Sequence, residues 1–174
     1  MRHKSLLFAA AVLVAISITL PVYGEEHMSH AASLAAKFGP VPGLPGCTTA
    51  APKKGDPGKE AFVVLAKGNT GCKIPWHWHT GNEQLMFVSG KAKLEMKDSP
   101  AATMMMAGDY INLPAKHVHQ FTCLAACKFF IESDLAFDIH YVDKEGKEIP
   151  QEEALKPVKR MAKGAKGTKM EGMH

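Results

Sequence analysis

The stretch Gly71–Gly90 reads GCKIPWHWHTGNEQLMFVSG, and the fold can be worked out from it. His77 and His79 are two residues apart, and on a β-strand this spacing places both imidazoles on one face. Residues 80–82, Thr-Gly-Asn, form a turn that brings Glu83 back beside the histidines on the next strand. Two neutral imidazoles and one carboxylate suit a divalent transition metal.

Short strands separated by turn residues continue on both sides of this stretch. Residues 91–97 alternate between apolar and charged side chains, which is typical of a half-buried strand. Apolar segments that end at Gly, Pro or Asn recur every 8–12 residues, with no long helical period between them. The expected strands are 61–66, 74–79, 84–88, 91–97, 103–106, 110–113, 117–123 and 127–132. This pattern predicts an all-β sandwich or barrel.

The histidine stretch resembles the first conserved motif of the cupin family, which has Gly, His-x-His, Glu and Gly at set intervals. In this sequence Gly71, His77, His79, Glu83 and Gly90 all stand at those intervals. A His pair alone can be two satisfied core residues, so the prediction rests on the complete spacing.

The second cupin motif is matched at Gly108, Pro114 and His119. The sequence departs from it at Lys116, where the family usually has Gly, and at Cys123, where it usually has Asn. Neither position is a ligand position in the family, so the departures concern the shape of the turn and the end of the strand.

The resemblance covers about Ala61–Tyr141. It implies a double-stranded β-helix, the cupin jelly-roll barrel, around one divalent transition metal ion. Iron, manganese, nickel, copper and zinc all suit the expected ligands, so the identity of the metal stays open. Those ligands are His77, His79, Glu83 and His119.

The alternation of side chains between the two faces of a strand also predicts which residues surround the metal. Leu85 and Phe87 share the inward face with Glu83, and Phe121 shares it with His119. These side chains either line an apolar cavity or simply fill the barrel core. Trp76, Trp78, Met86 and Val88 then point outward and need a cover, which the N-terminal arm or a second subunit could provide. Because cupins are often dimers, the resemblance favours a homodimer.

His117 is the candidate catalytic residue. It has the same parity as His119 and is expected near the metal ligands, where an imidazole can donate a hydrogen bond or transfer a proton. The alternative is a polar residue at the mouth of the barrel.

The chain divides into four segments by composition. We predict a cleaved export signal at 1–24, because two basic residues precede a 15-residue apolar stretch that is too short for a stable membrane span. An irregular arm rich in Pro and Gly follows at 25–58, the barrel at 59–150, and a basic, disordered tail at 151–174. The net charge of +4 resides in the leader and the tail, so nucleic-acid binding is not indicated.

Export would place the chain in the periplasm or outside the cell, where disulfides form. Its four cysteines allow three pairings. We expect a Cys123–Cys127 bridge across a hairpin of residues 117–123 and 127–132, with Cys47 and Cys72 as the second pair. The alternative is four buried thiols.

These features predict an exported metal-binding cupin. We expect a metal-dependent oxidoreductase with dioxygenase- or oxidase-like chemistry on a small molecule. The alternative is a non-catalytic protein that binds or senses a metal or a small ligand, because fold and ligands do not select a reaction.

Overall fold

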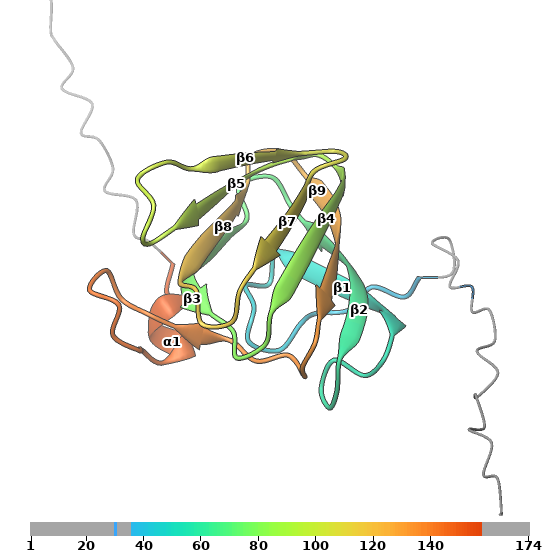
Figure 1. Cartoon of the computed structure of the whole chain (residues 1–174), viewed down its shortest axis with the longest axis horizontal. Helices are drawn as coiled ribbons and strands as arrows, with labels where there is room; N and C mark the ends of the chain where they lie inside the picture. Colours follow the sequence, from blue (N-terminus) through green and yellow to red (C-terminus); the bar gives the residue numbers. More distant parts are fainter. Residues whose placement is uncertain (1–29, 31–35, 158–174) are drawn as a thin grey trace, which may run out of the picture. The chain divides into compact units, whose positions relative to one another are not determined.

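The computed structural model describes residues 30 and 36–157, and these residues form an all-β jelly-roll barrel (Figure 1). Two five-stranded antiparallel sheets face each other, in the orders β1-β2-β9-β4-β7 and β10-β3-β8-β5-β6. The predicted fold class is confirmed. The elements are β1 (Thr48–Lys54), β2 (Phe62–Gly68), β3 (Lys73–Trp78), β4 (Glu83–Ser89), β5 (Lys91–Met96), β6 (Thr103–Met106), β7 (Tyr110–Leu113), β8 (His119–Cys123), β9 (Cys127–Ser133), β10 (His140–Tyr141) and α1 (Gln151–Ala154).

The core lies between the inner faces of the two sheets. From β3 onward the chain passes repeatedly from one sheet to the other, so alternate residues of nearly every strand meet in the middle. Phe87 stacks on Phe129 with ring centroids 5.1 Å apart, and Phe121 packs against both rings. All three side chains are buried, and Phe121 and Phe129 also line the cavity that contains the histidines.

The eight expected strands are all present, each within two residues of its predicted bounds. The prediction was wrong for the second half of the N-terminal arm, where Thr48–Lys54 forms β1. Pro52 is tolerated there because β1 is the edge strand of its sheet and the ladder is already irregular at that proline.

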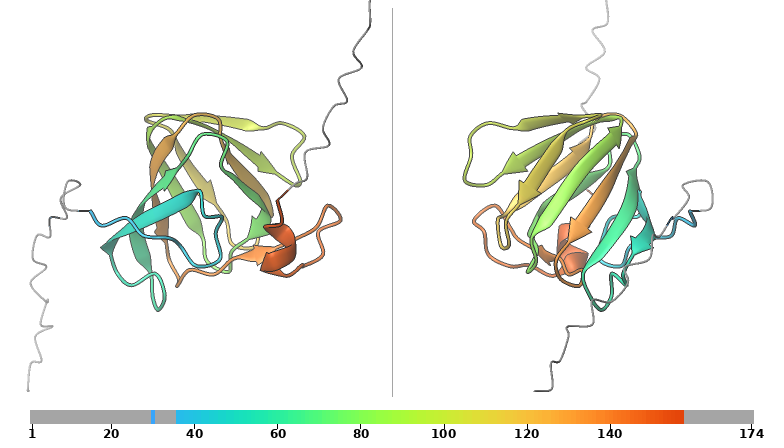
Figure 2. Two further views of the ribbon diagram at one scale, coloured as in Figure 1. Left: turned by 180° about the vertical axis from the view of Figure 1, so that it is seen from behind. Right: turned by 45° about the vertical axis from the view of Figure 1, so that its right-hand side comes forward.

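The arm is fastened to the barrel at several points. Gly39 and Ala50 exchange two backbone hydrogen bonds, and the Tyr141 hydroxyl donates to the carbonyl of Gly43 at 2.8 Å. Burial raises the pKa of Tyr141 to about 12, so the hydroxyl keeps its proton and remains a donor. The left-hand view of Figure 2 shows the arm and β1, in blue and cyan, lying across the barrel.

Both predicted disulfides are present. Cys47–Cys72 joins the arm to the residue before β3, and Cys123–Cys127 joins the end of β8 to the start of β9. The hairpin that we expected at the second bridge is wrong, because β8 and β9 belong to different sheets. The chain changes sheets at residues 124–126, so this disulfide connects the two layers of the barrel.

The C-terminal part of the described chain contacts both tryptophans of β3, because β10 lies beside β3 in the same sheet. Trp78 stacks on His140 with ring centroids 3.8 Å apart, and the Val142 amide donates to the carbonyl of Trp76. Lys97 places its ammonium group 6.0 Å from the Trp76 ring. The sequence analysis did not foresee these contacts of the two tryptophans with β10, Val142 and Lys97, and a second subunit on this face stays a prediction.

The signal at 1–24 and most of the basic tail lie outside the described residues. The four-residue helix α1 falls inside the range 151–174 that we assigned to the tail. Within the described part of the chain, no helix has the length and apolar character needed to cross a membrane.

Gly90 is required by the backbone between β4 and β5. Its φ is +90°, and a Cβ at this position would lie 2.2 Å from the carbonyl oxygen of Ala126. Gly108 has a similar φ of +94° but open space around it. We expect Gly108→Ala to lower the unfolding free energy by about 1 kcal/mol and Gly90→Ala by clearly more, because only Gly90→Ala adds a backbone clash. Equal losses in urea denaturation would contradict this ranking.

The two disulfides should differ in their contribution to stability. Cys47–Cys72 links residues 25 apart and Cys123–Cys127 links residues 4 apart. From loop-closure entropy, we expect Cys→Ala replacement of the first pair to cost about 3.5 kcal/mol and of the second about 2 kcal/mol. Thiol titration of unreduced, unfolded protein should find no free cysteine among the four. A peptide map that links Cys72 to Cys123 or Cys127 would show that the pairing is wrong.

Candidate metal centre

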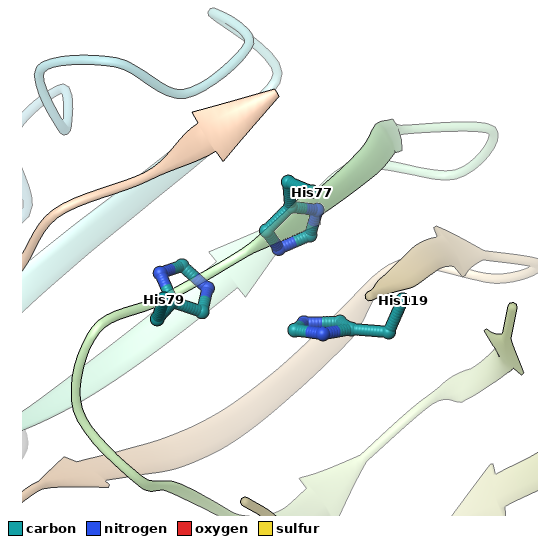
Figure 3. A group of neighbouring side chains, drawn as sticks. All are labelled: His77, His79 and His119. Carbon is teal, nitrogen blue, oxygen red and sulfur yellow. The ribbon is translucent and has the colours of Figure 1, made fainter. Parts of the chain in front are cut away.

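Three histidines converge at one end of the barrel interior (Figure 3). His77 on β3 is paired directly with His119 on β8, and His79 follows the end of β3. The His77 and His119 ring centroids are 4.2 Å apart, and one nitrogen from each of the three rings lies within 4.8 Å of the others. The antiparallel pairing of β3 with β8 therefore unites two motifs that are 40 residues apart in the sequence.

Backbone carbonyls fix the tautomer of all three rings. A carbonyl oxygen can only accept, so each Nδ1 carries the proton and donates it. Each Nε2 is then left with a free lone pair, as a metal ligand requires. For His77, His79 and His119 the Nδ1–oxygen distances are 2.6, 2.5 and 2.9 Å, to the carbonyls of Pro75, Asp138 and His117 respectively.

Burial keeps two of these imidazoles uncharged. It lowers the pKa of His77 well below its usual value, helped by the nearby His119 and His79 rings. Burial also lowers the pKa of His119, although the Glu83 carboxylate partly opposes it. A metal ion competes with protons for the ring nitrogen, so neutral imidazoles favour metal binding.

Glu83 brings a carboxylate to the same place from the opposite sheet. It is the first residue of β4 and is 9% exposed, and its Oε2 lies 3.7 Å from Nε2 of both His79 and His119. Two donors that bind one ion at about 2.1 Å each are about 3–4 Å apart. Three imidazoles with free Nε2 atoms and one carboxylate at this spacing fit a divalent transition metal.

The four side chains stand at one end of a cavity of about 310 Å³. Of the two alternatives for the inward apolar residues, both apply: Leu85 and Phe121 line the cavity, whereas Phe87 belongs only to the packed core. The sequence analysis missed the wall that β9 contributes, although the period-two alternation on that strand could have revealed it. It also missed the arm, whose Pro- and Gly-rich sequence carries no periodicity. The residues missed on these two segments include Val41, Leu44, Phe129 and Ile131.

Solved structures of similar fold come from several kinds of protein. The polyketide cyclase RemF from Streptomyces resistomycificus aligns over 74% of this chain and 99% of its own, with 18% identity and a TM-score of 0.58. An acetylacetone dioxygenase from Acinetobacter johnsonii aligns over 72% and 83%, with 16% identity and a TM-score of 0.54. An RmlC-like cupin from Shewanella frigidimarina aligns over 63% and 91%, with 16% identity and a TM-score of 0.51.

This chain has the cupin fold. No protein-family model matches its sequence, and no curated protein matches it either. Because the identities are low, the likeness to solved structures concerns the fold alone, and the chemistry of this chain has to be argued from its own residues.

The two departures from the second cupin motif have structural explanations in this chain. Lys116 has a φ of +64°, which accounts for the glycine that is usual at this position. Its amide donates to the carbonyl of His79, so the turn contacts the metal centre through its backbone. Cys123 forms the disulfide with Cys127 that connects the two sheets.

His117 lies in the turn before β8, and its side chain is exposed and outside the lining of the cavity. Its backbone carbonyl accepts the Nδ1–H of His119. The residue thus helps to orient one ring through its main chain, and a catalytic role of its imidazole stays a prediction.

Replacement of the cavity histidines should remove the metal and leave the barrel folded. We expect His77→Ala, His79→Ala and His119→Ala each to lower bound metal at least tenfold, because each removes one of four donors. Elemental analysis after equilibration with Zn²⁺ measures the loss, and circular dichroism verifies the fold. His30→Ala, which changes an exposed histidine, is the matched control. Full metal occupancy in two of the three variants would show that the site is assigned wrongly.

Proposed function

We propose that this cupin is an exported metal-dependent oxidoreductase that acts on a small molecule, with one divalent transition metal ion held by His77, His79, Glu83 and His119. The observation that carries the proposal is the position of these donors at the end of an apolar cavity. A buried set of donors that opens into a cavity of about 310 Å³ leaves room for a substrate beside the ion.

Some side chains of the site would bind the metal ion, and others would exclude water from it. The carbonyls that accept from the three Nδ1–H groups keep the imidazoles aimed at one point, and the Glu83 carboxylate supplies the only negative charge in the cavity lining of the described chain. Leu85, Phe121 and Ile131 exclude water from that point. The bound ion would supply Lewis acidity and, for a redox-active metal, activation of dioxygen.

Two observations support the exported location. Both cysteine pairs of the described chain form disulfides, which is typical of proteins in oxidising compartments. The leader at 1–24 has the composition of an export signal.

A non-catalytic binding or sensing protein is the second candidate. The observation that favours it is the cavity lining, which within the described residues contains no titratable side chain except the four donors, Lys37 and Lys67. No general acid or base in the described lining therefore faces a substrate, and a reaction would depend on the metal or on the exposed His117, which lies outside the lining.

Oxygen uptake separates the two candidates. Protein loaded in turn with iron, manganese, nickel or copper is incubated with diketones, catechols, flavonols and oxalate. Uptake above that of the His119→Ala variant supports the enzyme, whereas tight metal binding without turnover of any substrate supports the binding protein.

If His117 transfers protons, His117→Ala should lower kcat at least tenfold at unchanged metal content. An unchanged kcat would exclude that role.

A further inference from the structure

The polarity of the side chains that line the cavity indicates which molecules can bind there. Apart from the four donors and two lysines, the described lining consists of apolar side chains, glycines, prolines and two threonines. Thr48 donates its hydroxyl to the carbonyl of Pro45 and is thereby satisfied within the protein. A ligand body that lies against these walls has almost no polar partner, so polar groups there would lose their hydrogen bonds to water without replacement.

The apolar walls come from both sheets and from the arm. Leu85 and Ile131 belong to one sheet and Phe121 to the other, while Val41 and Leu44 close the cavity from the arm. A volume of about 310 Å³ holds about ten water-sized groups, which is the size of a single substituted ring and not of a sugar chain or a peptide.

The charge of the site limits the charge that the metal-binding end of the ligand can carry. An imidazole that binds a metal ion through Nε2 is neutral, so three imidazoles and one carboxylate carry one negative charge, that of Glu83. A divalent ion held by this set has a net charge of +1. A monoanionic ligand neutralises the centre, whereas a dianion would leave an uncompensated negative charge in an apolar, water-poor cavity.

The two lysines stand too far from the centre to compensate such a charge. Phe62, Ser133 and Glu83 form one row across their sheet, and Lys67 lies five residues further along β2. At about 3.4 Å per residue this is about 17 Å along the strand. The Lys67 ammonium lies 3.5 Å from the Phe38 ring centroid, and Lys37 is exposed, so both cations mark the outer end of the cavity. There they attract anions without neutralising them at the centre.

We infer that the ligand of this cavity is a monoanionic oxygen chelator with an apolar body of about one ring, such as the enolate of an aryl-substituted 1,3-diketone. Its two oxygens bind the ion that the three imidazoles and Glu83 would hold, and its body lies against Leu85, Ile131 and Leu44 of the arm. The charge argument rests on the proposed metal site, whereas the apolar walls exist without it.

Calorimetric binding to zinc-loaded protein tests the inference, because zinc is redox-inert and no turnover interferes. Three probes are compared: 1-phenylbutane-1,3-dione, acetylacetone, which has the same head without the ring, and oxalate, a dianion without an apolar body. We expect the phenyl diketone to bind at least tenfold more tightly than acetylacetone and at least about 100-fold more tightly than oxalate. Oxalate binding that equals or exceeds that of the phenyl diketone would overturn the inference.

A matched pair of variants tests the wall formed by the arm. Leu44→Asp places a carboxylate in the cavity wall, whereas Leu124→Asp makes the same change at a leucine that is 44% exposed and outside the lining. We expect Leu44→Asp to weaken binding of the phenyl diketone at least tenfold at unchanged zinc content, and Leu124→Asp to leave it unchanged. Equal affinity in the two variants would exclude the arm from the binding site.

A separate measurement shows whether the proposed metal site exists at all. If elemental analysis finds no zinc in the wild-type protein, the proposed function and the charge argument are both lost. Naphthalene, which has no chelating group, then probes the walls of the metal-free protein. Binding that Leu44→Asp abolishes supports the apolar site, and absence of binding to the wild type overturns it.

Discussion

Three hydrogen bonds from imidazole to backbone orient the histidine rings at the end of the cavity. Each Nδ1–H is held by a carbonyl, and the three carbonyls belong to β3, to the turn before β8 and to the segment before β10. The main chain of the barrel therefore orients the rings without an ion, which would reduce the conformational entropy lost if these rings bind one. Residues as distant in sequence as Pro75 and Asp138 thereby become part of one centre.

The inward-facing residues could be predicted from sequence because period two and the motif spacing point to the same face. His77, Glu83, Leu85, His119 and Phe121 are all buried or line the cavity, as that parity requires. The strands themselves were predicted because each one ends at a turn-forming residue. The sequence also indicated the partners of all four cysteines, although the argument for one pair assumed a hairpin that does not exist.

The errors all concern contacts between segments without a repeating pattern. A chain that passes from one sheet to the other uses turns that resemble hairpin turns, so the sequence around Cys123 could not distinguish the two. Pro52 argued against a strand because a central strand needs its amide, and only the complete sheet shows that β1 is an edge. The stacking of His140 on Trp78 depends on where the chain returns after β9, which no local signal encodes.

The cavity is built from two parts that the sequence keeps separate. The four candidate metal donors lie within or next to β3, β4 and β8, whereas much of the opposite wall is the arm, which the Cys47–Cys72 bridge and the Tyr141–Gly43 hydrogen bond fasten in place. Substitutions between residues 39 and 46 can therefore change the shape of the chamber without altering a donor or a strand pairing. Grafting of arms of different sequence onto one constant barrel is a direct route to a set of proteins that share the three-histidine cluster and differ in the shape of the chamber beside it.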